Sequence, residues 1–313
     1  MISLHRQKSR KTATILSEVV CLGIKPKELT LVYAHSTSGK LKIEICESYP
    51  YDNFKAELAS IVKKNNLRFK PCIWVLQPKE YELVLADAMP VVNAEFQAAA
   101  KWKLKDAVHF PKDDVIFDQF PVPKSPLETS NKIMVAATRF SLIHAKSEEI
   151  NESGLEMACI DIPELTYRNL TAFYEQDQKS TVLIVVKENQ VQVLITCQKQ
   201  IFFNRYINIE LGSKQTVNAE EHQKKIDRLE LEILRSSEYF QNQWRMPSPG
   251  RYFVVPTQLI SSEELSYISQ RLGSPVKFLT IDDMVQMDKA LDMFHQRKFI
   301  CLLGETLRLE RTG

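Results

Sequence analysis

The sequence predicts an α/β protein of two similar lobes, with a small α+β subdomain inserted into the first lobe. One observation behind this is a repeated order of elements, three short strands, a helix and a further strand, which recurs about 160 residues along the chain. Another is a stretch of about 70 residues that only the first copy contains. The length of 313 residues agrees, since roughly 150 residues per compact unit suggests two units.

Three strand-like runs open the first copy, at 18–24, 29–36 and 41–49. Turns at 25–28 and 37–40 contain proline and glycine and join these runs into a meander.

A helix is expected next, at 52–64, with Asp52 as its N-cap. Its apolar residues recur at helical spacing and therefore share one face, Phe54, Leu58, Ile61 and Val62. A strand at 72–76 follows the helix.

The second copy repeats this order with short turns. Its expected strands, long helix and closing strand lie at 181–187, 191–197, 201–209, 219–244 and 252–255. In the long helix, we expect Ile226, Leu229, Ile233 and Phe240 to form one buried stripe, because their spacings of three, four and seven suit a helix. A further helix at 262–272 and a strand at 276–279 complete this copy.

The first copy alone is interrupted, by the insert (82–154). We expect in it a strand at 82–89, a helix at 93–107, a strand at 115–122, a loop rich in Pro and Ser at 121–131, and a strand followed by a helix at 132–153. A strand at 155–161 and a helix at 163–176 then resume the first copy.

Three hairpin-linked strands followed by helical crossovers predict a mixed sheet with helices on its faces, which is the ribonuclease-H-like unit. Two such lobes in one chain are the plan of the actin-like ATPase fold. The expected division is a basic, flexible arm at 1–17, a first lobe at 18–81, 155–178 and 288–313, the insert at 82–154, and a second lobe at 179–287.

Composition favours a globular protein of the cytosol. Hydrophobic residues make up 44% and charged residues 26%, and the net charge of +2 gives no general reason to expect nucleic acid. No run reaches the roughly 18 to 20 apolar residues that a membrane span needs. The six cysteines stand singly, which favours reduced, buried thiols over a disulfide framework or a zinc site. Clustered Lys and Arg in the arm at 1–17 would allow weak attraction to an anionic membrane.

Several segments together resemble one family. The insert, with 87–90 (DAMP), 110–115 (FPKDDV) and 135–139 (VAATR), resembles that of PilM, the actin-like protein of type IV pilus assembly. The long-helix segment 229–240 is similar to that of MshI, the PilM-like protein of mannose-sensitive haemagglutinin (MSHA) pili, and 303–308 looks like the family's C-terminal helix end. The resemblance spans about 22 to 308.

The resemblance implies a protein at the cytoplasmic face of the inner membrane of a Gram-negative bacterium. Its family grips the N-terminal tail of a single-pass membrane protein, PilN-like or MshJ-like. The family's groove lies between the insert and the lobe that carries it, which points to Met89, Phe96, Phe110 and Ile133 as groove residues. The same residues also suit a packed core. Oligomeric state stays open.

An actin-like ATPase needs glycine in its phosphate loops, because backbone N–H groups must approach phosphates without interference from Cβ. The first loop has Lys25, Pro26 and Lys27 instead, and the second has Lys187 and Asn189. Neither has an Asp for Mg²⁺, and Pro26 lacks an N–H.

The expected adenosine turn, Pro256 and Thr257, also lacks glycine, and the chain has eight glycines where roughly 22 would be usual. The sequence therefore predicts a pseudo-ATPase with no catalytic residue, cofactor or metal. Asp113 and Asp114, and Asp282 and Asp283, are expected at turns and helix starts. The alternatives are an actin-like ATPase with atypical loops, or the cytoplasmic part of a type II secretion protein.

Overall fold

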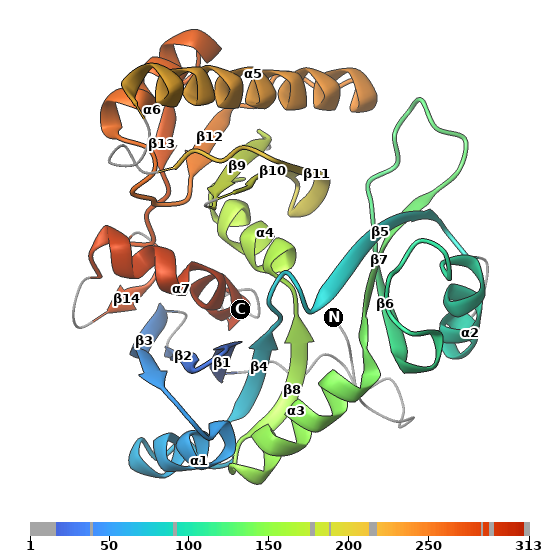
Figure 1. Cartoon of the computed structure of the whole chain (residues 1–313), viewed down its shortest axis with the longest axis vertical. Coiled ribbons are helices and arrows are strands. Elements are labelled where there is room, and N and C mark those ends of the chain that lie inside the picture. The colour runs from blue at the N-terminus through green and yellow to red at the C-terminus, as the bar shows by residue number, and fades with distance from the viewer. Residues whose placement is uncertain are drawn as a thin grey trace.

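The computed structural model describes residues 17–37, 40–89, 93–175, 179–187, 189–212, 218–282, 284–287 and 291–309. They form two large sheets and one small sheet, with helices between and around them (Figure 1). The arm at 1–17 lies outside the described residues except for Ser17.

The sheet of the first lobe has six strands in the order β14-β3-β2-β1-β4-β8. The meander comprises β1 (Glu18–Lys25), β2 (Glu28–Thr37) and β3 (Lys40–Pro50), and β4 (Pro71–Val75) and β8 (Glu156–Asp161) add on in parallel. The expected antiparallel meander is confirmed, because β1 pairs with β2 and β2 with β3.

Helix α1 (Phe54–Lys64) begins one residue later than expected. Its N-cap is Asn53, whose side chain accepts from the N–H of Ala56, so the expectation that Asp52 would cap the helix is wrong. Both residue types make good caps, and sequence alone does not separate neighbours of this kind.

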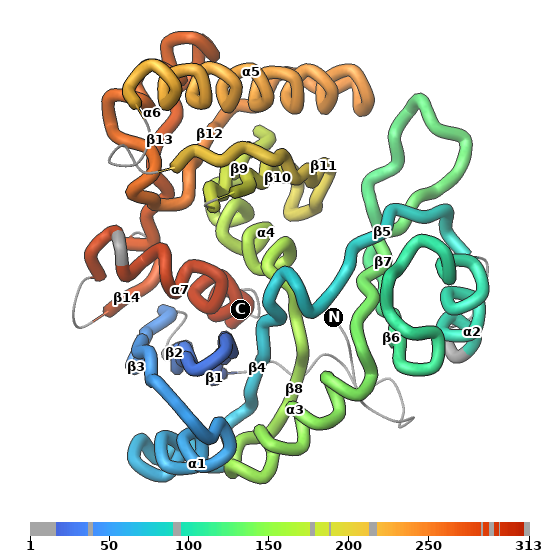
Figure 2. The backbone as a smooth tube through the Cα atoms, viewed as in Figure 1, coloured from blue at the N-terminus to red at the C-terminus, as the bar shows by residue number. Residues whose placement is uncertain are grey.

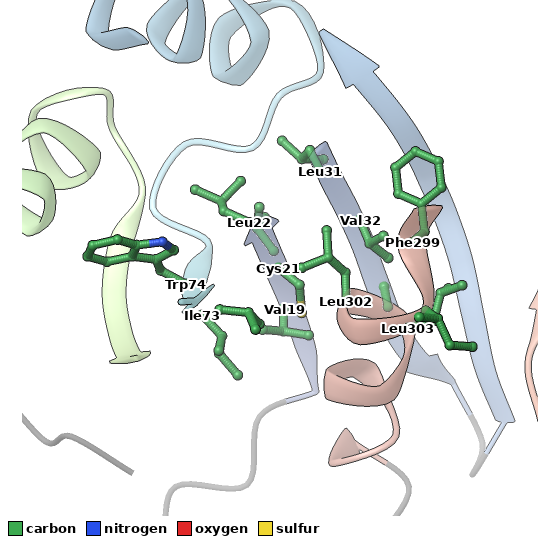
Figure 3. Packing of buried hydrophobic residues seen from close by; sticks show 14 of the residues in the cluster. Val19, Cys21, Leu22, Leu31, Val32, Ile73, Trp74, Phe299, Leu302 and Leu303 are labelled. Carbon is green, nitrogen blue, oxygen red and sulfur yellow. The ribbon is translucent and has the colours of Figure 1, made fainter. Parts of the chain in front are cut away.

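Helix α7 (Met293–Thr306) packs on one face of the six-stranded sheet, against β1 and β2. Figure 3 shows Phe299, Leu302 and Leu303 of α7 in one buried cluster with side chains of the strands, among them Cys21 and Val32. All of these side chains are buried, so the C-terminal helix contributes directly to the core of the first lobe.

The second lobe has a sheet in the order β11-β10-β9-β12-β13. Its strands are β9 (Thr181–Val186), β10 (Val191–Cys197), β11 (Gln200–Ile207), β12 (Arg251–Val254) and β13 (Val276–Phe278). The three meander strands are consecutive neighbours, as expected. On one face lie α5 (Ala219–Trp244) and α6 (Ser262–Leu272), and the predicted stripe of α5 is confirmed, since its four residues are fully buried.

Helix α4 (Pro163–Phe173) lies against β9, β10 and β11 and against α7. Helix α4 therefore contacts both lobes, and the expected assignment of 155–178 to the first lobe stays a prediction. Sequence periodicity identifies the buried faces of a helix but does not say which sheet it covers.

The insert is smaller than expected. Its sheet has the order β5-β7-β6, from β5 (Tyr81–Asp87), β6 (Val115–Pro121) and β7 (Lys132–Arg139), with α2 (Asn93–Lys103) and the 3-10 turn η1 (Lys112–Asp114). The next helix, α3 (Phe140–Glu152), packs instead against α1 and β8, so it belongs to the first lobe. From here on, the insert means 81–139.

The boundary at 287/288 is also displaced. Strand β14 (Gln286–Met287) pairs with β3 of the first lobe, and Leu279, Ile281 and Met284 are part of that lobe's core. The chain thus returns to the first lobe directly after β13.

The two pairs of aspartates have structural surroundings. Asp114 accepts from the N–H and the hydroxyl of Ser141 at the start of α3, at 2.7 and 2.5 Å. Asp113 is exposed in η1, and Asp282 is exposed and accepts from Gln296, while Asp283 lies outside the described residues.

Candidate functional site

The expected first phosphate loop is a tight turn between β1 and β2. Pro26 is followed by Lys27 with φ +63°, the pattern of a type II turn. The hydroxyl of Tyr51 donates to the carbonyl of Lys25 at 2.7 Å, and the N–H of Tyr51 donates to the carbonyl of Lys27 at 3.2 Å. Tyr51 thus holds the turn in a closed form.

Lys25 and Glu28 of this turn have charge partners within the chain. Glu28 accepts from Lys298 of α7 at 2.6 Å, and Lys25 lies 3.8 Å from the same carboxylate. The hydrogen bond from Lys298 is the main reason that the pKa of Glu28 lies below its ordinary value. A phosphate would have to compete with Glu28 for both lysines.

The expected second loop is the turn between β9 and β10. The N–H of Lys187 donates to the carbonyl of Gln190 at 2.9 Å, and Asn189 is exposed. Burial raises the pKa of the Cys301 thiol on α7, and the charge of Lys187 acts in the opposite direction. Lys298, which pairs with Glu28 of the first turn, lies on the same helix.

A cavity of about 570 Å³ opens beside Asn189. Both signs of charge line it, in Asn189, Asn208, Ile209, Glu210, Glu221, Lys225 and Arg228. Lys225 is already paired with Glu221 at 2.9 Å.

The expected adenosine turn is packed. Pro256 and Thr257 are both buried, and the Thr257 hydroxyl accepts from the N–H of Leu259 at 3.2 Å. In the part of the chain that the structure describes, no group of His, Cys, Asp and Glu side chains could hold a metal ion.

The four expected groove residues belong to one hydrophobic cluster inside the insert. Met89 and Phe96 are buried, and Phe110 and Ile133 are half-buried against the same cluster. Phe96 lies on α2, and the other three pack with it on the side of the small sheet that α2 covers. In the structure, all four residues are therefore part of the core of the insert. Their role in a groove stays a prediction.

The residues predicted from the sequence did not include the opposite face of the small sheet, which we call the open face. Strand register places Leu83 and Leu85 of β5, Met134 and Ala136 of β7, and Ile116 and Phe120 of β6 on it. Leu83, Ala136 and Phe120 pack toward the core of the first lobe, whereas Leu85 is 56% exposed. The signal was in the sequence, since Met134 alternates with Ile133 and must therefore face the other way.

A buried carboxylate joins the insert to the second lobe beside this face. Glu164, 1% exposed at the start of α4, accepts from the hydroxyls of Tyr81 on β5 and Tyr206 on β11, the former at 2.7 Å. Burial, followed by the charge of Glu164, raises the pKa of both tyrosines. Gln192 completes the cluster with its amide 3.5 Å from the carboxylate.

A second junction lies at the far end of the insert, where the loop after β6 meets the end of α5 (Figure 2). Ser125 donates to the carbonyl of Gln243 at 2.7 Å, and the indole N–H of Trp244 donates to the carbonyl of Pro123 at 3.1 Å. We call these contacts the clasp. The insert is thus fixed to the second lobe at two separate points.

Comparison of the sequence with family models and with curated proteins finds no match. Among solved structures, a chain of the PilM–PilN type IV pilus biogenesis complex has a TM-score of 0.66 at 18% identity, covering 95% of this chain and 99% of that one. The cytoplasmic domain of EpsL, an inner-membrane component of the type II secretion system of Vibrio cholerae, has a TM-score of 0.49 at 9% identity, covering 91% and 95%. The chain has the actin-like ATPase fold, as its two meanders predict.

Proposed function

We propose that this chain is a non-catalytic cytoplasmic scaffold of type IV pilus biogenesis, of the MSHA type. In this role it binds the N-terminal tail of a PilN-like or MshJ-like single-pass inner-membrane protein, and is peripheral on that membrane. The observation that carries the proposal is the open face of the insert. The likeness to a chain of the PilM–PilN complex supports it, since that chain is itself part of a pilus assembly complex.

The open face suits an extended peptide. Strand β5 pairs only with β7 among the described strands, so its other edge offers backbone N–H and C=O groups. An extended tail pairing with that edge would alternate its side chains, and one set would lie beside Leu85 on β5. The hydrogen bond of Tyr81 to Glu164 fixes the start of β5 and so keeps this edge rigid.

The loop positions support the proposal that the chain is non-catalytic. Tyr51 closes the first turn. The carboxylate of Glu28 in that turn is paired with Lys298. The adenosine turn is filled by Pro256 and Thr257. Among the described helices, none has the length and apolar character to cross a membrane.

The test is tail binding, measured by the anisotropy of a labelled synthetic tail from the candidate membrane protein. We expect Leu85→Asp to weaken binding at least tenfold, about 1.4 kcal/mol, because a carboxylate would meet the apolar side chains of the tail. Leu231→Asp on α5, which is also exposed, should leave the affinity unchanged. Equal affinity of Leu85→Asp and the parent would place the tail elsewhere, and no binding of any tail would end the proposal.

One observation favours a second candidate, an actin-like ATPase of pilus assembly or type II secretion with atypical loops. The cavity beside Asn189 carries Lys225 and Arg228, two cations that would suit a phosphate. Binding of Mg·ATP, treated at the end of the Discussion, separates the two candidates.

A further inference from the structure

Helix α2 presents a large apolar side chain to solvent. The indole of Trp102 is 74% exposed, although Phe96, Ala100 and Leu104 on the other side of the same helical segment are buried in the insert. The helical turn continues past α2, since the N–H of Leu104 donates to the carbonyl of Ala100 at 2.8 Å. The outward face of α2 therefore ends in an unburied tryptophan.

Exposed lysines surround this tryptophan. Lys101, Lys103 and Lys105 are all exposed, and all three lie within three residues of Trp102 in the chain. In the described ranges, none of the three lysines has an ion pair or a hydrogen bond to a carboxylate. Lys103 does lie near Asp87, whose own bonds go to Lys132 and Ser130.

Neither the exposed indole nor the cluster of lysines is favourable in water. Lys101 and Lys103 lie in the last turn of α2 and Lys105 follows just beyond it, so three like charges are close together and repel one another. Cations at a helix C-terminus are favoured by the helix dipole, which accounts for lysine there but not for an exposed indole. The opposing charges nearby are Asp106, next to the cluster, and Glu95 at the other end of α2, so the surface keeps an excess of positive charge.

We infer that this surface, made of Lys101, Trp102, Lys103 and Lys105, rests on an anionic lipid bilayer. Indole rings prefer the headgroup region of a membrane, where the apolar ring leaves water and the N–H stays solvated. Lysine side chains next to it meet the negative surface potential of anionic lipids. Figure 1 shows α2 at the outer side of the insert, away from both lobes, where a flat surface could reach it.

The contact is independent of tail binding. A few lysines and one indole make a weak and reversible membrane contact. Such a contact would orient the insert beside any membrane-anchored partner and raise the local concentration of the partner's tail.

The tryptophan itself is the reporter for the test. Of the three tryptophans, Trp74 is fully buried and Trp244 is half-buried, so a blue shift of indole emission on adding vesicles reports mainly Trp102. Vesicles of phosphatidylcholine with phosphatidylglycerol should cause the shift, and vesicles of phosphatidylcholine alone should not. Added salt should reverse it, because the attraction is between exposed charges.

Variants locate the contact. Lys101→Gln with Lys105→Gln should weaken vesicle binding roughly 25-fold, as expected for two lysines near an anionic surface. Lys63→Gln with Lys64→Gln, the same change in exposed residues of α1, should have no effect. Trp102→Ser should weaken sedimentation with vesicles and leave the melting temperature unchanged, since this side chain is outside the core.

Three results would overturn the inference. One is the absence of any emission shift with anionic vesicles. Another is vesicle binding without a shift, which would assign the membrane contact to another part of the chain, such as the basic residues at 1–17. The last is a shift that grows with protein concentration in the absence of vesicles, because Trp102 would then be covered by a second copy of the chain.

Discussion

Gly304 lies where α7 crosses α4, and the crossing leaves no room for a side chain. A Cβ added there would lie 2.5 Å from the carbonyl oxygen of Thr166 and 3.1 Å from Cγ of Leu170. In an exposed helix, Gly→Ala stabilises by up to about 1 kcal/mol. We expect Gly304→Ala to reverse that sign and lower the free energy of unfolding by about 1–3 kcal/mol, through overpacking. Urea unfolding measures it, and a variant more stable than the parent would contradict the close crossing.

The pair of Glu28 and Lys298 predicts a pH dependence. The pKa of Glu28 is lowered in the folded state, so the pair stabilises above the ordinary carboxyl pKa and loses that contribution as pH falls through the lowered value. Because Glu28 is about one third exposed, we expect a coupling of at most about 1 kcal/mol.

A double-mutant cycle isolates this coupling from the bond that Lys298 also makes to Ser48. Glu28→Gln and Lys298→Met, alone and together, should show coupling at pH 7 that disappears on the acid side of the lowered pKa. Coupling that persists unchanged into acid would mean that the two charges do not interact as the structure indicates.

At the scale of elements, sequence patterns predicted where the strands and helices lie in the chain better than they predicted which sheet each helix packs against. The meanders and the buried stripe of α5 follow from local periodicity, which depends on neighbours in the chain. The positions of α4 and α3 depend on which sheet is nearest in space. Ile133 and Met134 show the same limit, because alternation separates two faces of β7 but does not say which one α2 covers.

The clasp between the insert and α5 gives a prediction at this scale. Ser125 is 2% exposed, and Ser125→Ala removes its hydrogen bond to the carbonyl of Gln243 together with the bond that its hydroxyl accepts from the N–H of Leu127. We expect a loss of about 1–2 kcal/mol in the free energy of unfolding and faster amide exchange in 122–131. Ser130→Ala in the same loop is the matched control, since its exposed hydroxyl bonds only to Asp87. Similar exchange in both variants would show that the clasp does not hold the loop.

The whole molecule is held together by α4 and α7, which cross between the two large sheets, and by the insert, which reaches the second lobe through Glu164 and through the clasp (Figure 1). Sequence order predicted the two lobes but not these junctions, because Tyr81, Glu164 and Tyr206 are distant in the chain. Of the expected nucleotide positions, the first turn is closed by Tyr51 and the adenosine turn is packed, whereas a cavity lies beside Asn189 of the second turn.

Nucleotide binding tests the molecule as a whole, because ATP would have to contact both lobes at once. We expect no magnesium-dependent rise in melting temperature and no ATP hydrolysis above background. Glycines that would let the backbone approach phosphates are absent from both turns, and Glu28 competes for Lys25 and Lys298. Millimolar Mg·ATP bound with micromolar affinity would add roughly 4 kcal/mol of apparent stability.

A variant in the cavity beside Asn189 serves as the control for weaker binding of ATP. Arg228→Gln should abolish a small stabilisation by ATP that does not need magnesium, since a cation there can attract phosphate as a point charge without a cradle of backbone N–H groups. A large stabilisation that EDTA removes would instead require a metal-organised nucleotide between the lobes. In that case the two turns, with Lys25–Lys27 and with Lys187 and Asn189, would have to open on binding, and Tyr51 would have to release the carbonyl of Lys25. The chain would then be an ATPase with atypical loops.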